Sequence, residues 1–267
     1  MATASAMLTL VGITACSSNQ ESRSSVDDST ATEAPAEEKV LIMATSADYP
    51  PYEFYDTASG SSEPIGFDID IAKAITEELG YTLKIEDMDF NGIVPALQAE
   101  RVDFAMAGMT PTEERKQSVD FSQVYYDAKN TIISLDGAGF ASYEDLEGKK
   151  VGVQLGSIQE GEAKEKAETI SMTIEPRNKI SELVQEIKAG RLDAAIVEDT
   201  VAKGYVANND DLVFTTIEGD GESGSAIAFP KGSPLVEEFD AVLTDLIESG
   251  ELDGMIQIWF EDYYNQQ

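Results

Sequence analysis

Residues 102–122 read VDFAMAGMTPTEERKQSVDFS and join a buried strand to the start of a helix. Apart from Asp103, the first seven residues form an apolar run, which predicts a strand covered on both faces. In the TPTE that follows, Thr110 is expected at the helix N-cap, with proline at the first helical position and Glu113 completing a capping box. The first N–H groups of such a helix point outward, and Arg115 adds a permanent positive charge. The stretch predicts either a site for a carboxylate or phosphate, or an ordinary strand–turn–helix with a solvated arginine.

Part of this stretch has a second copy further along the chain. Residues 99–110, AERVDFAMAGMT, and 189–200, AGRLDAAIVEDT, share Ala, Arg, Asp, Ala and Thr at matching positions. The match is either an internal repeat or a coincidence between two units of similar composition. As a repeat it predicts two similar lobes, with Gly108 and Glu198 at the ends of equivalent strands. Ligands bind outside the carboxyl ends of strands in open α/β sheets, so these two residues become candidates for a site.

The second half of the chain also repeats the helix start. After the strand VGVQL, Gly156 permits a tight turn, and Ser157 with Glu160 forms a second candidate capping box. The first N–H groups of that helix would be available to an anion. Two helix starts, one from each lobe, would then hold one anion between them; the alternative is a plain N-cap.

Strand and helix patterns alternate along the whole chain from residue 40 onward, which predicts an α/β fold with mostly parallel sheets. The strands expected from apolar or alternating runs are 40–45, 81–86, 102–108, 130–135, 151–155, 192–197 and 226–230. The helices expected from 3.6-residue periodicity lie within 66–80, 93–100, 159–168 and 181–189, with further helices at the C-terminus.

Composition excludes several classes of function. The 267 residues include 51 acidic and 18 basic side chains, and the formal charge of −33 argues against nucleic acid and anionic lipid headgroups as partners. The chain has no histidine and one cysteine, which excludes Ser-His-Asp and Cys-His catalysis, histidine-based zinc sites and intrachain disulfides. We therefore expect no metal and no cofactor. Hydrolysis by a pair of carboxylates stays possible, although most acids are expected at the surface.

The N-terminal 38 residues differ in composition from the rest. Cys16 follows a short apolar run, and ITAC resembles a bacterial lipobox, whose cysteine becomes the lipidated first residue of the mature protein. We expect a lipoprotein signal segment over 1–16 and lipidation of Cys16, although the segment lacks the basic residues usual at the start of a secretory signal. Residues 17–38 are rich in Ser, Thr, Ala and Glu and predict a disordered tether. The alternative is a frayed N-terminus with a free or buried thiol.

Several spaced segments of the chain resemble the solute-binding family 3 proteins, the extracytoplasmic amino-acid receptors of ABC importers. In the family's order, and across about residues 40–264, they are GFDIDIAKAI, DFNGIVPAL, AGMTPTEERKQSVDFS, LEGKKVGVQLGS and IQIWF. Thr76 departs from the family signature, which prefers a smaller residue there. The resemblance implies a periplasmic-binding-protein-like type II fold, in which two lobes are joined by a two-stranded hinge. The boundaries it implies are lobe 1 over 39–126 and 225–267, lobe 2 over 127–224, and hinge crossings near 125–130 and 222–227.

The resemblance also implies a ligand site for an amino acid. Arg115 would pair with the α-carboxylate, helped by the backbone N–H groups of Thr110 and Ile158. The α-amino group would meet the carbonyl of Gly108 and the carboxylate of Glu198, where many members have aspartate. The aromatic walls would be Tyr49 and Phe90, and the positions that help to select the ligand side chain would be Ser46 and Gln154.

The residues and the resemblance together predict an extracytoplasmic lipoprotein that captures a polar or basic L-amino acid. It would close two lobes on the ligand, deliver it to the permease of an ABC importer, act as a monomer and catalyse no reaction. A zwitterion needs a cation and N–H donors at one end and an acid at the other, and both are present in the sequence. Two alternatives stay open, a dehydratase-like enzyme that holds a carboxylate with Arg115, and the input domain of a sensor.

Overall fold

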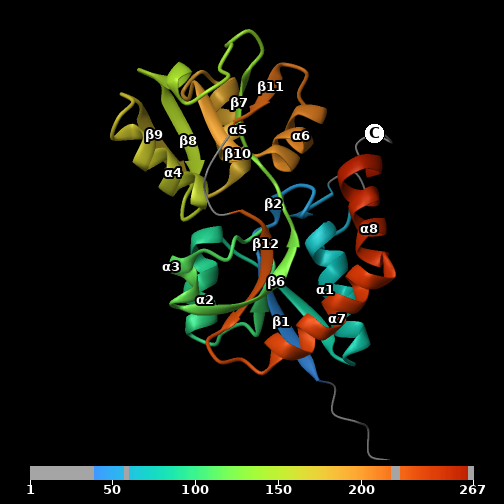
Figure 1. The fold of residues 1–267 in the computed structure, drawn as a ribbon. Coiled ribbons are helices and arrows are strands. Elements are labelled where there is room, and N and C mark those ends of the chain that lie inside the picture. The colour runs from blue at the N-terminus through green and yellow to red at the C-terminus, as the bar shows by residue number, and fades with distance from the viewer. Residues whose placement is uncertain (1–38, 57–59, 218–222, 264–267) are drawn as a thin grey trace, which may run out of the picture. The chain divides into compact units, whose positions relative to one another are not determined.

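Two five-stranded sheets organise the chain in the computed structural model, which describes residues 39–56, 60–217 and 223–263 (Figure 1). The predicted signal segment 1–16, its Cys16 and the predicted tether 17–38 lie outside the described residues, as does residue 222 of the second hinge crossing. In spatial order, the first sheet consists of β4 (Thr82–Asp87), β1 (Val40–Thr45), β5 (Phe104–Ala105), β12 (Ser225–Pro230) and β6 (Val119–Tyr126). The second sheet consists of β11 (Leu212–Thr216), β7 (Asn130–Leu135), β10 (Ala194–Glu198), β8 (Lys150–Gln154) and β9 (Thr173–Arg177).

Both sheets are mostly parallel, as the sequence predicts. In the first sheet every strand runs in one direction except β12, which is antiparallel to β5 and to β6. In the second sheet the exception is β7, which is antiparallel to β10 and to β11. The chain leaves the first sheet between Tyr126 and Asn130 and returns between Thr216 and Ser225. Two connections between the lobes follow from this order, and the reversed strand of each sheet comes directly after one of them.

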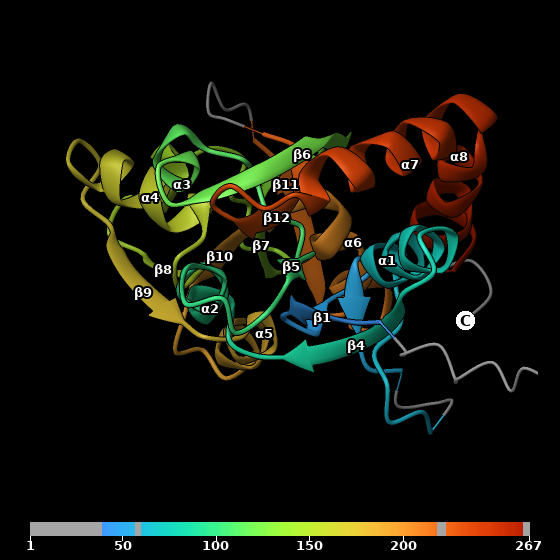
Figure 2. The ribbon, with the colours of Figure 1, turned by 90° about the horizontal axis from the view of Figure 1, so that it is seen from below.

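Helices cover the sheets and carry their apolar faces inward. In the first lobe, α1 (Phe67–Glu78) packs against α7 (Leu235–Ser249) and α8 (Glu251–Ile256), and these three lie together at one side of the sheet (Figures 1 and 2). The short η1 (Phe90–Gly92), α2 (Ile93–Gln98) and α3 (Glu113–Lys116) lie away from them. The second lobe has the turn η2 (Glu144–Leu146) and three helices, α4 (Ile158–Ala167), α5 (Ile180–Lys188) and α6 (Asp199–Ala207), and η3 (Gln257–Asp262) follows α8. In α5 the buried residues Ile180, Leu183, Val184 and Ile187 repeat at helical spacing, so burial of this face fixes the helix on β8 and β10.

The echoed segments occupy equivalent places in the two sheets. β5 and β10 are the central strands, and each lies between a parallel and an antiparallel neighbour. The aspartate before each strand makes the same pair of contacts, because Asp103 accepts from the backbone N–H of Ile42 at 2.7 Å and Asp193 accepts from that of Lys150 at 2.8 Å. The backbone N–H of each aspartate donates to the carbonyl of the same partner. The internal match is therefore a structural repeat that ties each central strand to its parallel neighbour.

Two details of the opening stretch differ from the prediction. The strand is shorter than 102–108, because only Phe104 and Ala105 pair with β1, and Ala105 alone also pairs with β12, before the chain turns at Gly108. The helix N-cap is Thr112 and not Thr110, since the Thr112 hydroxyl accepts from the backbone N–H of Arg115 at 3.2 Å. The reason is that the Thr110 carbonyl faces the Arg115 side chain and accepts from it at 2.8 Å, which keeps Thr110 outside the helix.

The β2–β3 hairpin positions the site between the sheets. β2 (Asp48–Tyr49) pairs with β3 (Glu53–Phe54), and β2 packs against α5 of the second lobe. Behind the hairpin lies an aromatic part of the core in which the rings of Tyr126 and Phe260 stack at 4.3 Å. Tyr52 and Phe67 meet the Phe260 ring edge to face. This packing holds the hairpin on the first lobe, while Asp48 at the start of β2 contacts the second lobe by accepting from the backbone N–H of Ser181.

Candidate functional site

A cavity between the two lobes brings together all of the predicted ligand-binding residues except Ser46. The space it leaves in this structure is small, about 10 Å³ for the centre of a water molecule. The predicted residues that line it are Tyr49, Phe90, Gly108, Thr110, Arg115, Gln154, Ile158 and Glu198. Ser46 is buried outside this lining and donates from its hydroxyl to the Asp48 carboxylate at 3.4 Å. The same cavity is lined by Ala107, Ser157 and Gln159, which the sequence did not single out as ligand-facing side chains.

Arg115 holds a position between the two lobes. Its guanidinium donates from Nη1 to the carbonyl of Thr110 at 2.8 Å and from Nη2 to the carbonyl of Gly156, in the second lobe, at 3.0 Å. Its Cζ lies 5.3 Å from the centre of the Phe90 ring, within the range of a cation–π contact. Three fixed contacts orient a group that is permanently charged, so the cation is held in place for an incoming anion. Phe90 thus supports the arginine in addition to lining the cavity.

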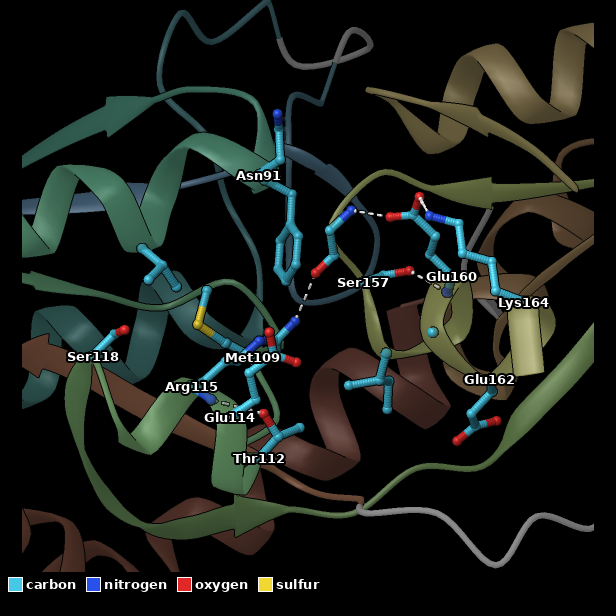
Figure 3. Close-up of a pocket in the computed structure, with 15 residues that line it drawn as sticks. Asn91, Met109, Thr112, Glu114, Arg115, Ser118, Ser157, Glu160, Glu162 and Lys164 are labelled. Atoms are coloured by element: carbon cyan, nitrogen blue, oxygen red, sulfur yellow. Dashed lines mark hydrogen bonds and ion pairs between the residues drawn. The ribbon is translucent and has the colours of Figure 1, made fainter.

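The start of α4 faces Arg115 from the second lobe (Figure 3). Ser157 is the N-cap, and its hydroxyl accepts from the backbone N–H of Glu160 at 3.1 Å. Glu160 in turn accepts from the backbone N–H of Gly156 at 2.6 Å and pairs with Lys164 at 2.6 Å. Gly156 has φ of +80°, and a Cβ there would lie 3.1 Å from Cβ of Asn91. The predicted cap is confirmed, except that Glu160 bonds to Gly156 and not to the N-cap residue itself.

A wider cleft adjoins the cavity on this side and shares Phe90, Arg115, Ser157 and Ile158 with it. Figure 3 shows Glu114 and Arg115 on one side of the cleft and Ser157, Glu160 and Lys164 on the other. Because Arg115 borders both spaces, the arginine lies at the entrance to the cavity. A ligand carboxylate placed between Arg115 and the start of α4 would meet a guanidinium and a helix N-terminus together.

Glu198 supplies the acidic part of the cavity. It ends β10, its side chain is buried at 7% exposure, and its Oε2 has no hydrogen-bond partner among the described residues. Burial raises the pKa of the Glu198 carboxyl to about 8, although the nearby hydroxyl of Tyr52 opposes this rise. A buried carboxyl oxygen without a hydrogen-bond donor is costly in free energy unless a partner arrives. The position favours a ligand that brings an ammonium or another N–H donor.

A network of buried acids supports Gly108 from behind. The Asp68 carboxylate accepts from the backbone N–H of Gly108 at 2.9 Å and from the Tyr125 hydroxyl at 2.8 Å. Burial raises the pKa of Asp68 to about 6. Burial also raises the pKa of the fully buried Glu53 well above its usual range, and the neighbouring Asp68 adds to that rise. Gly108 itself has φ of +54°, and a Cβ there would lie 2.9 Å from the Tyr49 ring, so both conformation and space require glycine.

The sequence did not assign Glu53, Asp68 or Gln159 to the site. Asp68 lies within GFDIDIAKAI, where an acid in the first turn of a helix reads as an ordinary helix start. Glu53 follows the proline-rich turn in a chain with 51 acidic residues, so no local signal separates it from surface acids. Gln159 follows the N-cap serine by two residues, so the sequence predicts a role for its backbone N–H group but none for its side chain. Only the packing of the lobes identifies these side chains.

Other kinds of site find no support in the described part of the chain. No group of three or more acidic or cysteine side chains there is arranged to hold a metal ion. None of the described helices is long and apolar enough to cross a membrane.

Comparison with known proteins places the chain. Residues 41–262 match the model of the bacterial extracellular solute-binding proteins, family 3. The chain is similar to the arginine-binding extracellular protein ArtP of Bacillus subtilis (strain 168), at 48% identity over 83% of this chain and 86% of that protein. It is also similar to the solved structure of an ancestral arginine-binding protein bound to arginine, with a TM-score of 0.78 and 39% identity over 84% of this chain and 99% of that one.

A second similar solved structure is an amino acid ABC transporter substrate-binding protein from Streptococcus pneumoniae bound to L-arginine. It has a TM-score of 0.78 and 37% identity over 83% of this chain and 94% of that one. The sequence motifs, the two-lobed fold and the interlobe cavity agree with the family match. This chain belongs to the bacterial extracellular solute-binding proteins, family 3.

Proposed function

We propose that the amino acid captured by this protein is L-arginine, held between the lobes by its α-carboxylate, its α-ammonium and its side chain. The observation that carries the proposal is the pairing in one cavity of an oriented cation, Arg115, with a buried carboxyl group, Glu198, whose Oε2 has no partner among the described residues. An α-amino acid carries a carboxylate and an ammonium on one carbon atom, and these groups complement the cation and the carboxyl group of the cavity. Two of the relatives named above are arginine-binding proteins and the third is bound to L-arginine, which supports the choice among amino acids.

The surroundings of the cavity favour a cationic side chain. Among the described residues that line it, Arg115 is the sole basic side chain, and Tyr49 and Phe90 provide aromatic faces. The Asp48 carboxylate belongs to the residue before Tyr49, and it accepts from the Ser46 hydroxyl and from the backbone N–H of Ser181 at 3.3 Å. An aromatic face and a nearby acid stabilise a guanidinium. A glutamate side chain would meet no second cation in this lining.

Isothermal titration calorimetry tests the proposal directly. The purified protein is titrated with L-arginine, L-lysine, L-histidine, L-glutamine and L-glutamate, and Arg115→Ala serves as the site control. We expect L-arginine to bind most tightly and Arg115→Ala to weaken it by more than about tenfold, because a charge-assisted bidentate contact is removed. Tighter binding of another amino acid would identify that amino acid, and not arginine, as the ligand. If none of them binds, the amino-acid site is refuted.

We also propose that the closed, loaded protein delivers its ligand to the permease of an ABC importer. The family match and the ABC transporter protein among the similar structures support this step. Uptake of radiolabelled L-arginine in cells that lack the gene measures it. Wild-type protein should restore uptake and Arg115→Ala should not; restoration by both variants would contradict it.

The attachment of the protein is proposed to be a lipid on Cys16, outside the cell membrane, with residues 17–38 as the tether. Support comes from the lipobox-like ITAC in the sequence and from the extracellular family. Mass spectrometry of protein extracted from membranes should find a mature chain that starts at a lipidated Cys16, and Cys16→Ala should release the protein from the membrane fraction. An unmodified cysteine behind an intact Met1 would refute the anchor.

We further propose a monomer with lobe 1 over 39–126 and 225–267 and lobe 2 over 127–224, which releases its ligand chemically unchanged. The strand order supports this division, and the family consists of binding proteins. Light scattering should give the mass of a single chain, which is 28.8 kDa before the signal segment is removed. Incubation with L-arginine followed by mass spectrometry should recover arginine alone, and any converted product would revive the dehydratase-like alternative.

A further inference from the structure

Gln159 lines the cavity with a side-chain amide that must take one of two orientations. The residue is buried at 5% exposure in the first turn of α4. Its Nε2 donates to Oδ1 of Asn130 at 2.9 Å. With Nε2 committed to Asn130, Oε1 is the atom that Gln159 offers to a ligand as an acceptor. If the amide turned over, an N–H donor would face the ligand instead.

The orientation of Gln159 depends on its neighbour and on a carboxylate beyond it. Nδ2 of Asn130 donates to Oε2 of Glu162 at 2.7 Å, and the Tyr143 hydroxyl donates to the same oxygen at 3.4 Å. An ionised carboxylate can only accept hydrogen bonds, so Asn130 has to turn its NH₂ group toward Glu162. The Oδ1 atom of Asn130 then faces Gln159, which has to donate a hydrogen bond to it from its own NH₂ group. The charge on Glu162 thereby sets the direction of both hydrogen bonds in the series Gln159–Asn130–Glu162.

Helix α4 and strand β7 hold the three residues of this hydrogen-bond series in place. Gln159 and Glu162 are three residues apart on α4 and so share one face of the helix, and the amide of Asn130 spans them. Asn130 is the first residue of β7, directly after the chain has crossed from the first sheet. Its carbonyl accepts from the backbone N–H of Ile217 at 2.9 Å, and it pairs with Glu198 in the register of β7 and β10. Asn130, the middle residue of the hydrogen-bond series, is thus fixed to the sheet that carries Glu198.

We propose that Asn130 and Glu162 are positioning residues for ligand binding, which hold the Gln159 amide with its oxygen toward the ligand and so favour ligands that bring an ammonium or a guanidinium. The inference rests on the proposed function, because it needs a cationic amino acid in the cavity. It adds two residues that line no part of that cavity to the set that determines its preference.

Variants that remove the carboxylate from residue 162, or move it to residue 130, test the proposal. Glu162→Gln removes the fixed acceptor, so the amides lose their common direction. Glu165→Gln is the matched control, because Glu165 lies exposed on the same helix and the change in net charge is identical. The exchange variant Asn130→Asp/Glu162→Gln restores an obligatory acceptor in the middle of the hydrogen-bond series, which again forces Gln159 to donate, and it keeps the wild-type charge.

The affinity for L-arginine of the purified proteins is measured at pH 7.5 by calorimetry, and thermal unfolding without ligand confirms that each variant folds. We expect Glu162→Gln to weaken arginine about fivefold relative to Glu165→Gln, the size of one neutral hydrogen bond. The exchange variant should recover to within about twofold of wild type. Adding Glu162→Gln to Gln159→Leu should cause no further loss, since the carboxylate acts through Gln159.

Two results would refute the positioning role of Asn130 and Glu162 while leaving arginine capture intact. In the first, Glu162→Gln binds L-arginine as tightly as Glu165→Gln does. In the second, the exchange variant binds L-arginine no better than Glu162→Gln does. Failure of the wild-type protein to bind L-arginine would instead refute the proposed function, and the positioning role with it.

Discussion

The carboxyl group of Glu198 is deprived of water without receiving a hydrogen-bond donor at Oε2 from any described residue. Its pKa of about 8 lies above the ordinary value of 4.5, mainly because of burial. The folded protein therefore holds a proton that the unfolded chain releases between these pH values. The contribution of Glu198 to the free energy of unfolding is fully present below about pH 4.5 and is lost as the pH rises through about 8.

Ligand binding should show the opposite pH dependence at this residue. An ammonium or guanidinium favours ionised Glu198, so the affinity for arginine should rise with pH up to about 8, by at most about tenfold per pH unit for one proton. Calorimetry at pH 6, 7 and 8 measures the slope, and Glu198→Gln should flatten it. A Glu198→Gln variant with an unchanged slope would assign the titration to another group.

Charge alone should not be enough at position 115. Arg115 reaches the carbonyls of Thr110 and Gly156 with two nitrogens of one planar group, and a lysine has a single ammonium. We therefore expect Arg115→Lys to weaken arginine binding by more than about tenfold, while leaving the melting temperature of the ligand-free protein nearly unchanged. Near-wild-type affinity in this variant would show that the site needs only a positive charge.

At the scale of elements, the second sheet depends on the close approach of α5 to β8. Gly152 of β8 is buried, and a Cβ there would lie 2.7 Å from Cδ2 of Leu183 in α5 and 2.7 Å from Cδ1 of Leu192. Gly161 in α4 differs, because a Cβ there would meet nothing within 4 Å. The two glycines therefore respond to the same substitution for different reasons.

Alanine at these two positions should change stability in opposite directions. Gly152→Ala should lower the free energy of unfolding by about 1–3 kcal/mol through overpacking. Gly161→Ala should raise it by about 0.5–1 kcal/mol, because alanine favours a helix interior. Urea unfolding measures both. Equal effects would mean that the packing of α5 on β8 adapts to the extra methyl group.

At the scale of the whole molecule, polar contacts join the lobes around the cavity. Asn178 donates to Asp89 at 2.8 Å, the backbone N–H of Ser181 donates to Asp48 at 3.3 Å, and Arg115 donates to Gly156. These contacts require closed lobes, so a ligand that binds both lobes shifts the population toward the closed state. The ligand contributes no more than its difference in affinity between the two states.

Small-angle scattering should therefore report a smaller radius of gyration when L-arginine is added. Asn178→Ala removes one closing contact outside the cavity and should weaken arginine severalfold, as the loss of one exposed hydrogen bond implies. Asp89→Ala should have the same effect, and the double variant should lose little more. An unchanged radius of gyration with bound arginine would refute closure as the response to the ligand.

The sequence by itself determined the class of fold and predicted most of the residues that line the candidate site. Alternating periodicities predict the strands and helices, and the repeated Asp103 and Asp193 mark the central strand of each sheet, because local propensity and pattern suffice for elements that bury one face. The motifs also located Arg115, Glu198 and the cap at Ser157. All three lie at the ends of strands or the starts of helices, where a local signal exists.

Only the tertiary structure decided what long-range contacts control. Thr112 replaces Thr110 as the N-cap because the Thr110 carbonyl is engaged by the Arg115 side chain, which no local pattern reveals. Glu53 and Asp68 look like any other acids in an acidic chain until packing removes their water. The chain from Glu162 through Asn130 to Gln159 joins a helix to a distant strand, so its direction exists only once the lobe has folded. Burial and contact between remote segments are properties of the assembled molecule, and they fix the electrostatics of the site.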